Sequence, residues 1–220
     1  MADETYRVRR MKLNESDANR IGKWSSLWAD LIHIDMVLAA RSEVPNVPAN
    51  VFHRRGLWES AIVSYGRMAV SERRRKLDHE DLLRAARGDR GVEFHEVLMG
   101  WRHDHVAHRL SQDLETVTVC VDYPDEQPDV LDSIRVFVSP SGGPVDDSPF
   151  VVEFREHAKA LRDALWEKYL APPAEMIAKR GPRGILMPAQ PPPPEGLTIQ
   201  QVLWSRVSGT GIAGSRSPNP

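Results

Sequence analysis

The stretch that decides the fold is SDANRIGKWSSLWADLIHIDMVLAAR, residues 16–41. Its apolar residues recur every three or four positions, the period of one helix face. They are Ile21, Trp24, Leu27, Trp28, Leu31, Ile34 and Leu38. Ser16 or Asp17 can cap the start of a helix here, and Pro45 and Pro48 prevent its continuation. The stretch therefore predicts a long helix that packs one face into a core.

A second apolar stripe and a short capped segment follow. The stripe has the same helical spacing and consists of Leu57, Trp58, Ala61, Ile62, Tyr65, Met68 and Ala69. Asp78 is placed to cap a short helix that Gly88 stops, and a further helix is predicted to begin after Gly91. The pattern favours consecutive helices in one bundle.

The last predicted helix begins at Ser148, a capping residue, with Pro149 at its first position. Its stripe consists of Val151, Phe154, Ala158, Leu161, Leu165 and Tyr169. We expect Pro172 and Pro173 to end this helix near Leu170. Eight apolar residues are expected to share the core of the bundle. They are Trp24, Trp28, Leu57, Ile62, Phe94, Leu98, Leu161 and Leu165.

The hydrophobic period changes from helical to two at Glu115. Val117, Val119 and Val121 alternate with more polar residues, which predicts a strand, and a second strand is expected over 134–139. A Pro- and Asp-rich connection joins them, so the two strands are expected to form an antiparallel hairpin. Cys120, the one cysteine, is interpreted as a small buried hydrophobe in this run.

These patterns predict a mainly α protein, a bundle of four to five helices with a small β-hairpin insertion at about 115–139. Residues 1–15 are expected to be an N-terminal tail, 16–171 the helical domain, and 172–220 a Pro/Gly-rich, mostly disordered tail. Within that tail Thr198 to Gln201 has capping-box spacing and leads into Val202, Leu203 and Trp204. Two interpretations of this segment remain open: a short helix that docks on the protein or on a partner, and a transient helix in a disordered tail.

Composition limits the compartment and the partners. The 220 residues carry a formal charge of −2, which provides no general attraction to nucleic acid. One cysteine, a charged N-terminus and no long apolar run predict a cytoplasmic protein without a membrane partner. The best basic patch is Arg73, Arg74, Arg75 and Lys76. It is either a solvated helix end or a nucleic-acid-binding patch.

The segment that carries chemistry reads WRHDHVAHR, residues 101–109. On an α-helix, Arg102, His105 and His108 fall within an arc of about 120°, so one surface can present all three. In one interpretation these are helix-end residues favoured by the helix dipole, with one histidine inside the core. A metal interpretation fits less well, because His103 would lie about 160° from His105. We expect no metal and no cofactor.

The pair Arg102 and His108, with five residues between them and the polar His103 after the arginine, resembles the signature of the HEPN superfamily (higher eukaryotes and prokaryotes nucleotide-binding). The local string is similar to the Ala-His version found in bacterial abortive-infection and toxin proteins. The predicted arrangement of helices resembles the family from Ser16 to Leu170, whereas matching motif residues are confined to Trp101 to Arg109. The hairpin departs from the minimal four-helix form.

The resemblance implies metal-independent RNA cleavage, of toxin or phage-defence type, in a cleft between two protomers of a homodimer. Carried over, His108 is the acid or base, Arg102 stabilises the phosphorane, and His103 orients the site. Asp104 and His105 are secondary candidates. An antitoxin or other protein partner is also implied. The alternative is a non-catalytic dimeric binding or scaffold protein of the same fold.

Overall fold

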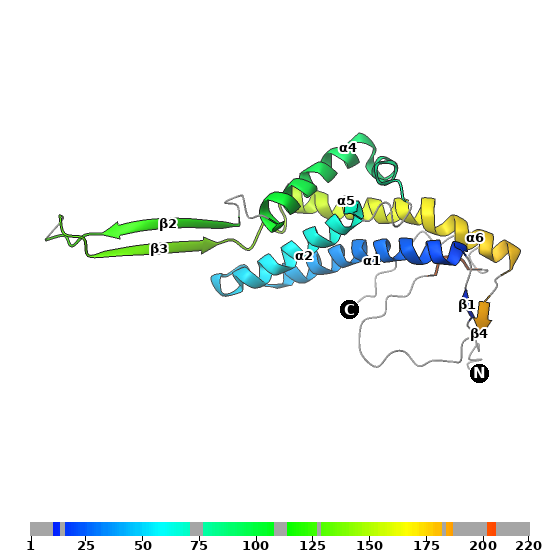
Figure 1. Ribbon diagram of the computed structural model, residues 1–220, viewed down its shortest axis with the longest axis horizontal. Coiled ribbons are helices and arrows are strands. Elements are labelled where there is room, and N and C mark those ends of the chain that lie inside the picture. The colour runs from blue at the N-terminus through cyan, green and yellow to red at the C-terminus, as the bar shows by residue number, and fades with distance from the viewer. Residues whose placement is uncertain are drawn as a thin grey trace.

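A computed structural model describes residues 11–13, 16–70, 77–107, 114–126, 129–181, 184–186 and 202–205. The protein is mainly helical, and its strands form two antiparallel sheets of two strands each (Figure 1). Among the helices described, none is both long enough and apolar enough to cross a bilayer. The helices pack around one core, and one of the two sheets projects from it.

The two longest stripes form an antiparallel helix pair. Helix α1 (Ser16–Glu43) ends just before Pro45, and α2 (Val51–Val70) begins after a short 3-10 turn at Pro48–Asn50. The stripe residues predicted from residue 24 to residue 38 are buried, as are those of α2 from Trp58 to Met68. The helical period in the sequence therefore identified the core-facing side of both helices.

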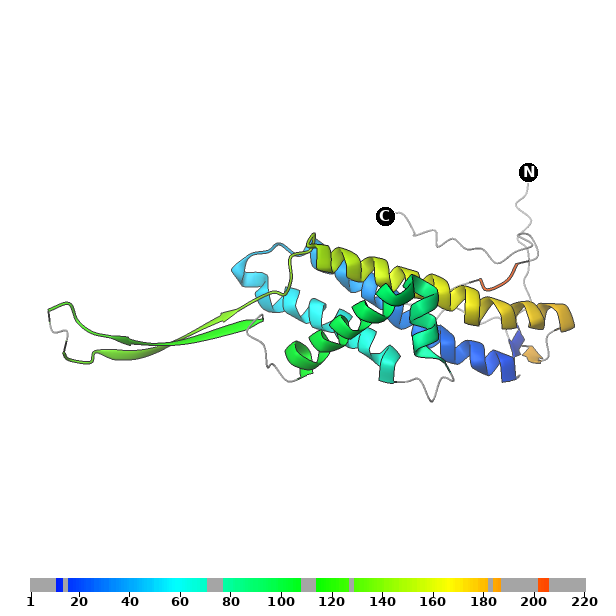
Figure 2. The same ribbon diagram turned by 90° about the horizontal axis from the view of Figure 1, so that it is seen from above.

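Helix α4 (His79–Trp101) is broken once. The Asp78 carboxylate caps its start by accepting a hydrogen bond of 2.9 Å from the Asp81 N–H, as expected. At Gly88 the backbone has φ 59°, a conformation that suits glycine and bends the helix (Figure 2). The second half starts before Gly91, earlier than predicted. Gly91 lies inside it, where a Cβ would come within 2.4 Å of the Leu83 carbonyl oxygen.

Helix α5 (Pro149–Leu165) starts at the predicted cap, where the Ser148 hydroxyl accepts a hydrogen bond from the Val151 N–H. The expected end near Leu170 is wrong. A π-helical turn, η3 (Trp166–Leu170), leads directly into α6 (Ala171–Arg180). Pro172 and Pro173 lie in the first turn of α6, where the missing proline N–H costs no helical hydrogen bond.

Both regions predicted as tails contain ordered segments. Strand β1 (Met11–Leu13) pairs with β4 (Gly184–Leu186), so residues at the two ends of the helical body form a small sheet (Figure 1). The short helix expected at Val202 is absent from the described residues 202–205, which are non-helical, although Leu203 packs against the core. Thr198 to Gln201 lie outside the described residues.

One core gathers the predicted apolar residues. Trp24, Trp28, Ile62, Phe94, Leu98, Leu161 and Leu165 are buried together, and Leu57 packs on their edge. The fully buried Trp58 makes edge-to-face contacts with Trp101 at 5.4 Å and Phe154 at 5.9 Å between ring centroids. The predicted shared core is confirmed, with Leu57 at its periphery.

Strands β2 (Glu115–Asp122) and β3 (Ser133–Pro140) form the predicted antiparallel hairpin. It extends away from the helices as an arm in both views (Figures 1 and 2). Cys120 is only half-buried, contrary to the expectation, because it lies on this arm opposite Arg135 rather than in the core. The alternation of side chains predicted the strands but not their exposure.

Candidate functional site

The segment singled out by the sequence forms a π-helical turn, η2 (Arg102–Ala107), that continues α4. In a π-helix each hydrogen bond spans five residues, and such turns occur frequently at functional sites. The wider turn changes the angular positions expected for an α-helix. Arg102 and Asp104 are half-buried, and His103 is exposed.

His105 does not share an accessible surface with Arg102, contrary to the expectation. It is buried and stacks on Trp101, with the ring centroids 3.9 Å apart and an angle of 19° between the planes. The stacking directs the imidazole toward the core aromatic cluster rather than toward solvent. His105 therefore belongs to the packing beneath η2.

A notch in α2 accommodates the Arg102 side chain. Gly66 is buried in that helix, and a Cβ built on it would lie 2.2 Å from Arg102 Cδ and 2.5 Å from Nε. Glycine inside a helix costs roughly 1 kcal/mol relative to alanine. The missing side chain at Gly66 is thus what allows Arg102 to cross α2 at close range.

Arg102 differs from the other buried and half-buried arginines in the described part of the chain. Each of those faces a carboxylate. The pairs are Arg41 and Arg54 with Asp146, Arg55 with Glu59, Arg87 with Glu153, and Arg162 with Asp35. Within the same residues Arg102 has no ion-pair partner. Its guanidinium therefore keeps its charge and donors available for an anion.

The structure brings Arg102, His103 and Asp104 together in one turn. His108 lies outside the described residues, and so do Arg73, Arg74, Arg75 and Lys76, so their roles stay predictions. In the part of the chain that is described, no group of three or more His, Cys, Asp or Glu side chains is arranged to hold a metal ion. The accessible chemistry of η2 consists of one cation, one imidazole and one carboxylate.

A second group of ionisable residues lies inside the bundle. The buried Tyr65 hydroxyl is hydrogen bonded to His95 Nδ1 at 2.8 Å and to His157 Nε2 at 3.0 Å. The His79 and His95 rings meet with their centroids 4.5 Å apart. Burial lowers the pKa of His157 to about 3 and that of His95 to about 4. These histidines are neutral at physiological pH, and His79 and His157 are buried.

Sequence reasoning missed this cluster, although one signal was present. His157 stands three residues after Phe154 and four before Leu161, so it lies on the apolar stripe of α5. A histidine at a stripe position needs a buried hydrogen-bond partner. Tyr65, on the stripe of α2, is that partner.

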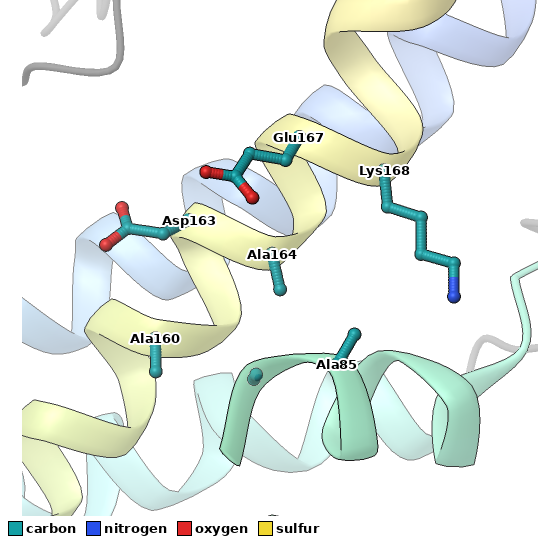
Figure 3. A pocket seen from close by; sticks show the side chains of 7 residues that line it. Ala85, Ala160, Asp163, Ala164, Glu167 and Lys168 are labelled. Atoms are coloured by element: carbon teal, nitrogen blue, oxygen red, sulfur yellow. The ribbon is translucent and has the colours of Figure 1, made fainter. Parts of the chain in front are cut away.

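A hollow of about 470 Å³ lies between α4 and α5, apart from η2. Four alanines form part of its lining, and Asp163 on α5 and Glu167 on η3 point away from Ala85 and Ala164 (Figure 3). Lys168 pairs with Asp81. The one cation in its lining is already paired, and the two acids point away from its alanines, so η2 remains the candidate site.

Comparisons with protein-family models, with curated proteins and with solved structures found no significant match to this chain. The function of the chain is therefore inferred from its own residues and their geometry.

Proposed function

We propose that this chain is a metal-independent endoribonuclease of the HEPN type, a toxin or phage-defence factor acting through Arg102 and His108. One observation carries the proposal: Arg102 crosses α2 in the Gly66 notch and faces no carboxylate in the described residues. An arginine held in place and left unpaired is suited to bind the phosphate of a nucleic acid.

The chemistry follows from the residue types. His108 removes the proton from a ribose 2′-OH, or donates one to the leaving 5′-oxygen. The oxygen of the 2′-OH attacks the adjacent phosphorus, the bond to the 5′-oxygen breaks, and a 2′,3′-cyclic phosphate remains. The Arg102 guanidinium stabilises the negative charge that develops on the phosphorane oxygens. His103, exposed one residue further along η2, orients the phosphate.

The required experiment compares RNA cleavage by the purified chain and its variants. Arg102→Ala and His108→Ala should each abolish cleavage, and the products of the unmodified chain should end in 2′,3′-cyclic phosphate. Activity should persist in a chelator. A substrate with a 2′-deoxy sugar at the scissile position should resist, since it lacks the nucleophile.

Arg155→Ala is the matched control, because Arg155 is exposed on α5, away from η2. It should cleave as fast as the unmodified chain. Equal cleavage by the double variant of Arg102 and His108 would contradict the proposal. Products with a 3′-hydroxyl at the cleaved bond would also contradict it, because such products require an external nucleophile in place of the 2′-OH.

A second candidate is a non-catalytic dimeric binding or scaffold protein of the same fold. The exposed apolar residues of the projecting hairpin favour it, since such surfaces mark interaction sites. This candidate predicts RNA or protein binding without cleavage, and binding that survives Arg102→Ala.

A further inference from the structure

The hairpin arm is fixed firmly to the helical body. Arg41 and Arg54, both buried, pair with Asp146 in the segment that follows β3. Arg41 also donates to the Gly142 carbonyl at 2.9 Å. At the other strand the buried Arg55 donates to the Leu114 carbonyl at 3.4 Å. Several buried cations thus hold the base of an arm whose remainder projects into solvent.

One face of the arm is aliphatic over three consecutive cross-strand pairs, beyond the Glu115 and Pro140 pair at its base. In the register of the sheet, Val117 pairs with Val138, Val119 with Val136, and Val121 with Ile134. All six side chains point to the same face, because side chains on a strand alternate with period two. They are between 46% (Val121) and 65% (Ile134) exposed. The other face carries Thr, Ser, Cys, Arg and Asp side chains together with Phe137.

An isolated two-stranded hairpin has marginal stability in water, and a contiguous exposed apolar face marks a contact surface. Because the base of the arm is held firmly and its aliphatic face is exposed, we expect another apolar surface to cover this face. The face contains no charge between its two ends, so it selects for another uncharged apolar surface. An identical aliphatic face satisfies that requirement.

We propose that the occupant is the same face of a second copy of this chain, with the two arms antiparallel. The acidic tip decides the direction. Asp125, Glu126, Asp129 and Asp132 are exposed there, and the neighbouring cation Arg135 already pairs with Asp122. Parallel arms would place two acidic tips side by side, which like-charge repulsion disfavours.

The antiparallel arrangement fixes the contacts. A twofold axis that reverses the strand direction and brings the two faces together passes through the Val119 and Val136 pair. Val119 then opposes Val119 of the second copy, and Val117 opposes its Val121. Each tip meets the base of the other arm.

Exposed apolar residues at both ends of the arm extend this contact. The tip exposes Tyr123, Val130 and Leu131. Val47, Phe52 and Val145 are exposed in the segments that meet at the base. Those segments are adjacent, because a Cβ on Gly142 would contact Arg54 Cβ at 3.2 Å. Tip and base therefore present apolar surfaces where the antiparallel arrangement brings them together.

The area supports the extended contact. A two-stranded face of eight residues measures roughly 26 Å by 10 Å. Two such faces alone fall short of the roughly 1,200 Å² that specific interfaces bury. Both tips and both bases must therefore take part in the contact if it is to reach the area of a stable dimer. The interface goes beyond the proposed ribonuclease function, since it uses none of the residues of η2.

The test is the mass of the full chain in solution, measured by light scattering across a dilution series. The unmodified chain should have the mass of two chains, or of four where the homodimer of the proposed ribonuclease also forms. Val119→Lys with Val136→Lys places four lysines at the twofold axis and should halve the mass of the unmodified chain. The matched control is Thr118→Lys with Phe137→Lys, the neighbouring cross-strand pair on the opposite face, and it should keep the unmodified mass.

A second measurement needs no change to the aliphatic face. A spin label on Asp125→Cys, in a Cys120→Ser background, reports the separation of the two tips. Antiparallel arms should hold the labels more than about 20 Å apart, from the rise per residue. The proposal would be overturned if the unmodified protein had the mass of one chain or if the Val119 and Val136 variant kept the unmodified mass. A lower mass of the control variant, or tips closer than this distance, would also overturn it.

Discussion

The base of the hairpin and the π-helical turn η2 place arginine side chains in opposite electrostatic environments. At the base, Arg41 and Arg54 converge on Asp146 and donate to backbone carbonyls. At η2, Arg102 lies in the notch of Gly66 with no carboxylate facing it among the described residues. A charge compensated within the chain maintains structure, whereas one left uncompensated is available to a ligand.

The largest expected effect comes from removing the compensation at the base. Asp146→Ala leaves two buried guanidinium groups without their counter-charge, which should destabilise the fold by about 3–5 kcal/mol. The adjacent Asp147 is exposed, so Asp147→Ala should change stability by less than about 0.5 kcal/mol. Urea unfolding followed by circular dichroism measures both. Equal losses in the two variants would show that the base does not depend on Asp146.

The effect of acid on stability should distinguish the buried histidine cluster, which is neutral, from the base of the hairpin, which is charged. The pKa of His157 is lowered to about 3 by burial first and then by Arg87, His95 and His79. The unfolded chain takes up a proton on this histidine below pH 6.5, and the folded chain does so only near pH 3. Stability present above pH 6.5 is therefore lost as the pH falls.

The loss should be on the order of 3 kcal/mol for this one histidine between pH 6.5 and 4. His157→Leu removes the titrating group and should flatten the stability profile over that range. Urea unfolding at closely spaced pH values tests it. An unchanged slope in the variant would mean that His157 does not cause the acid sensitivity.

Only a small change in stability is expected at Arg102. Arg102→Ala loses packing against Gly66 but breaks no ion pair described in the structure, so the free energy of unfolding should change by less than about 1 kcal/mol. Thermal unfolding of Arg102→Ala, measured beside that of Asp146→Ala, compares the losses of stability in the two variants. A loss as large as that of Asp146→Ala would place Arg102 with the structural arginines.

The sequence predicted what depends on periodicity. The stripes of α1, α2 and α5 identified their buried faces, and Ser148 and Asp78 identified two helix starts. The end of α5 was missed because the π-helical turn η3 carries the chain into a new helix at the two prolines. Local sequence rules describe α-helical hydrogen bonding, and a π turn changes it.

The site shows the same limit. The sequence singled out Arg102 and His103, but an α-helical arc placed His105 on the same surface as Arg102, and η2 buries it against Trp101. The Gly66 notch is a tertiary contact between two helices, so no local pattern indicates it. Likewise, the alternation in β2 and β3 defined an aliphatic face but not whether anything covers it.

The role of the Gly66 notch in catalysis is measured by the rate of RNA cleavage by Gly66→Ala beside that by Gly56→Ala. Both replace a glycine of α2, and each should gain up to about 1 kcal/mol of helix stability. Only at Gly66 does the new methyl collide with Arg102, whereas no atom lies within 4 Å of the Cβ position at Gly56. Cleavage should fall at least tenfold in Gly66→Ala and stay unchanged in Gly56→Ala. Equal cleavage by both variants would contradict the account.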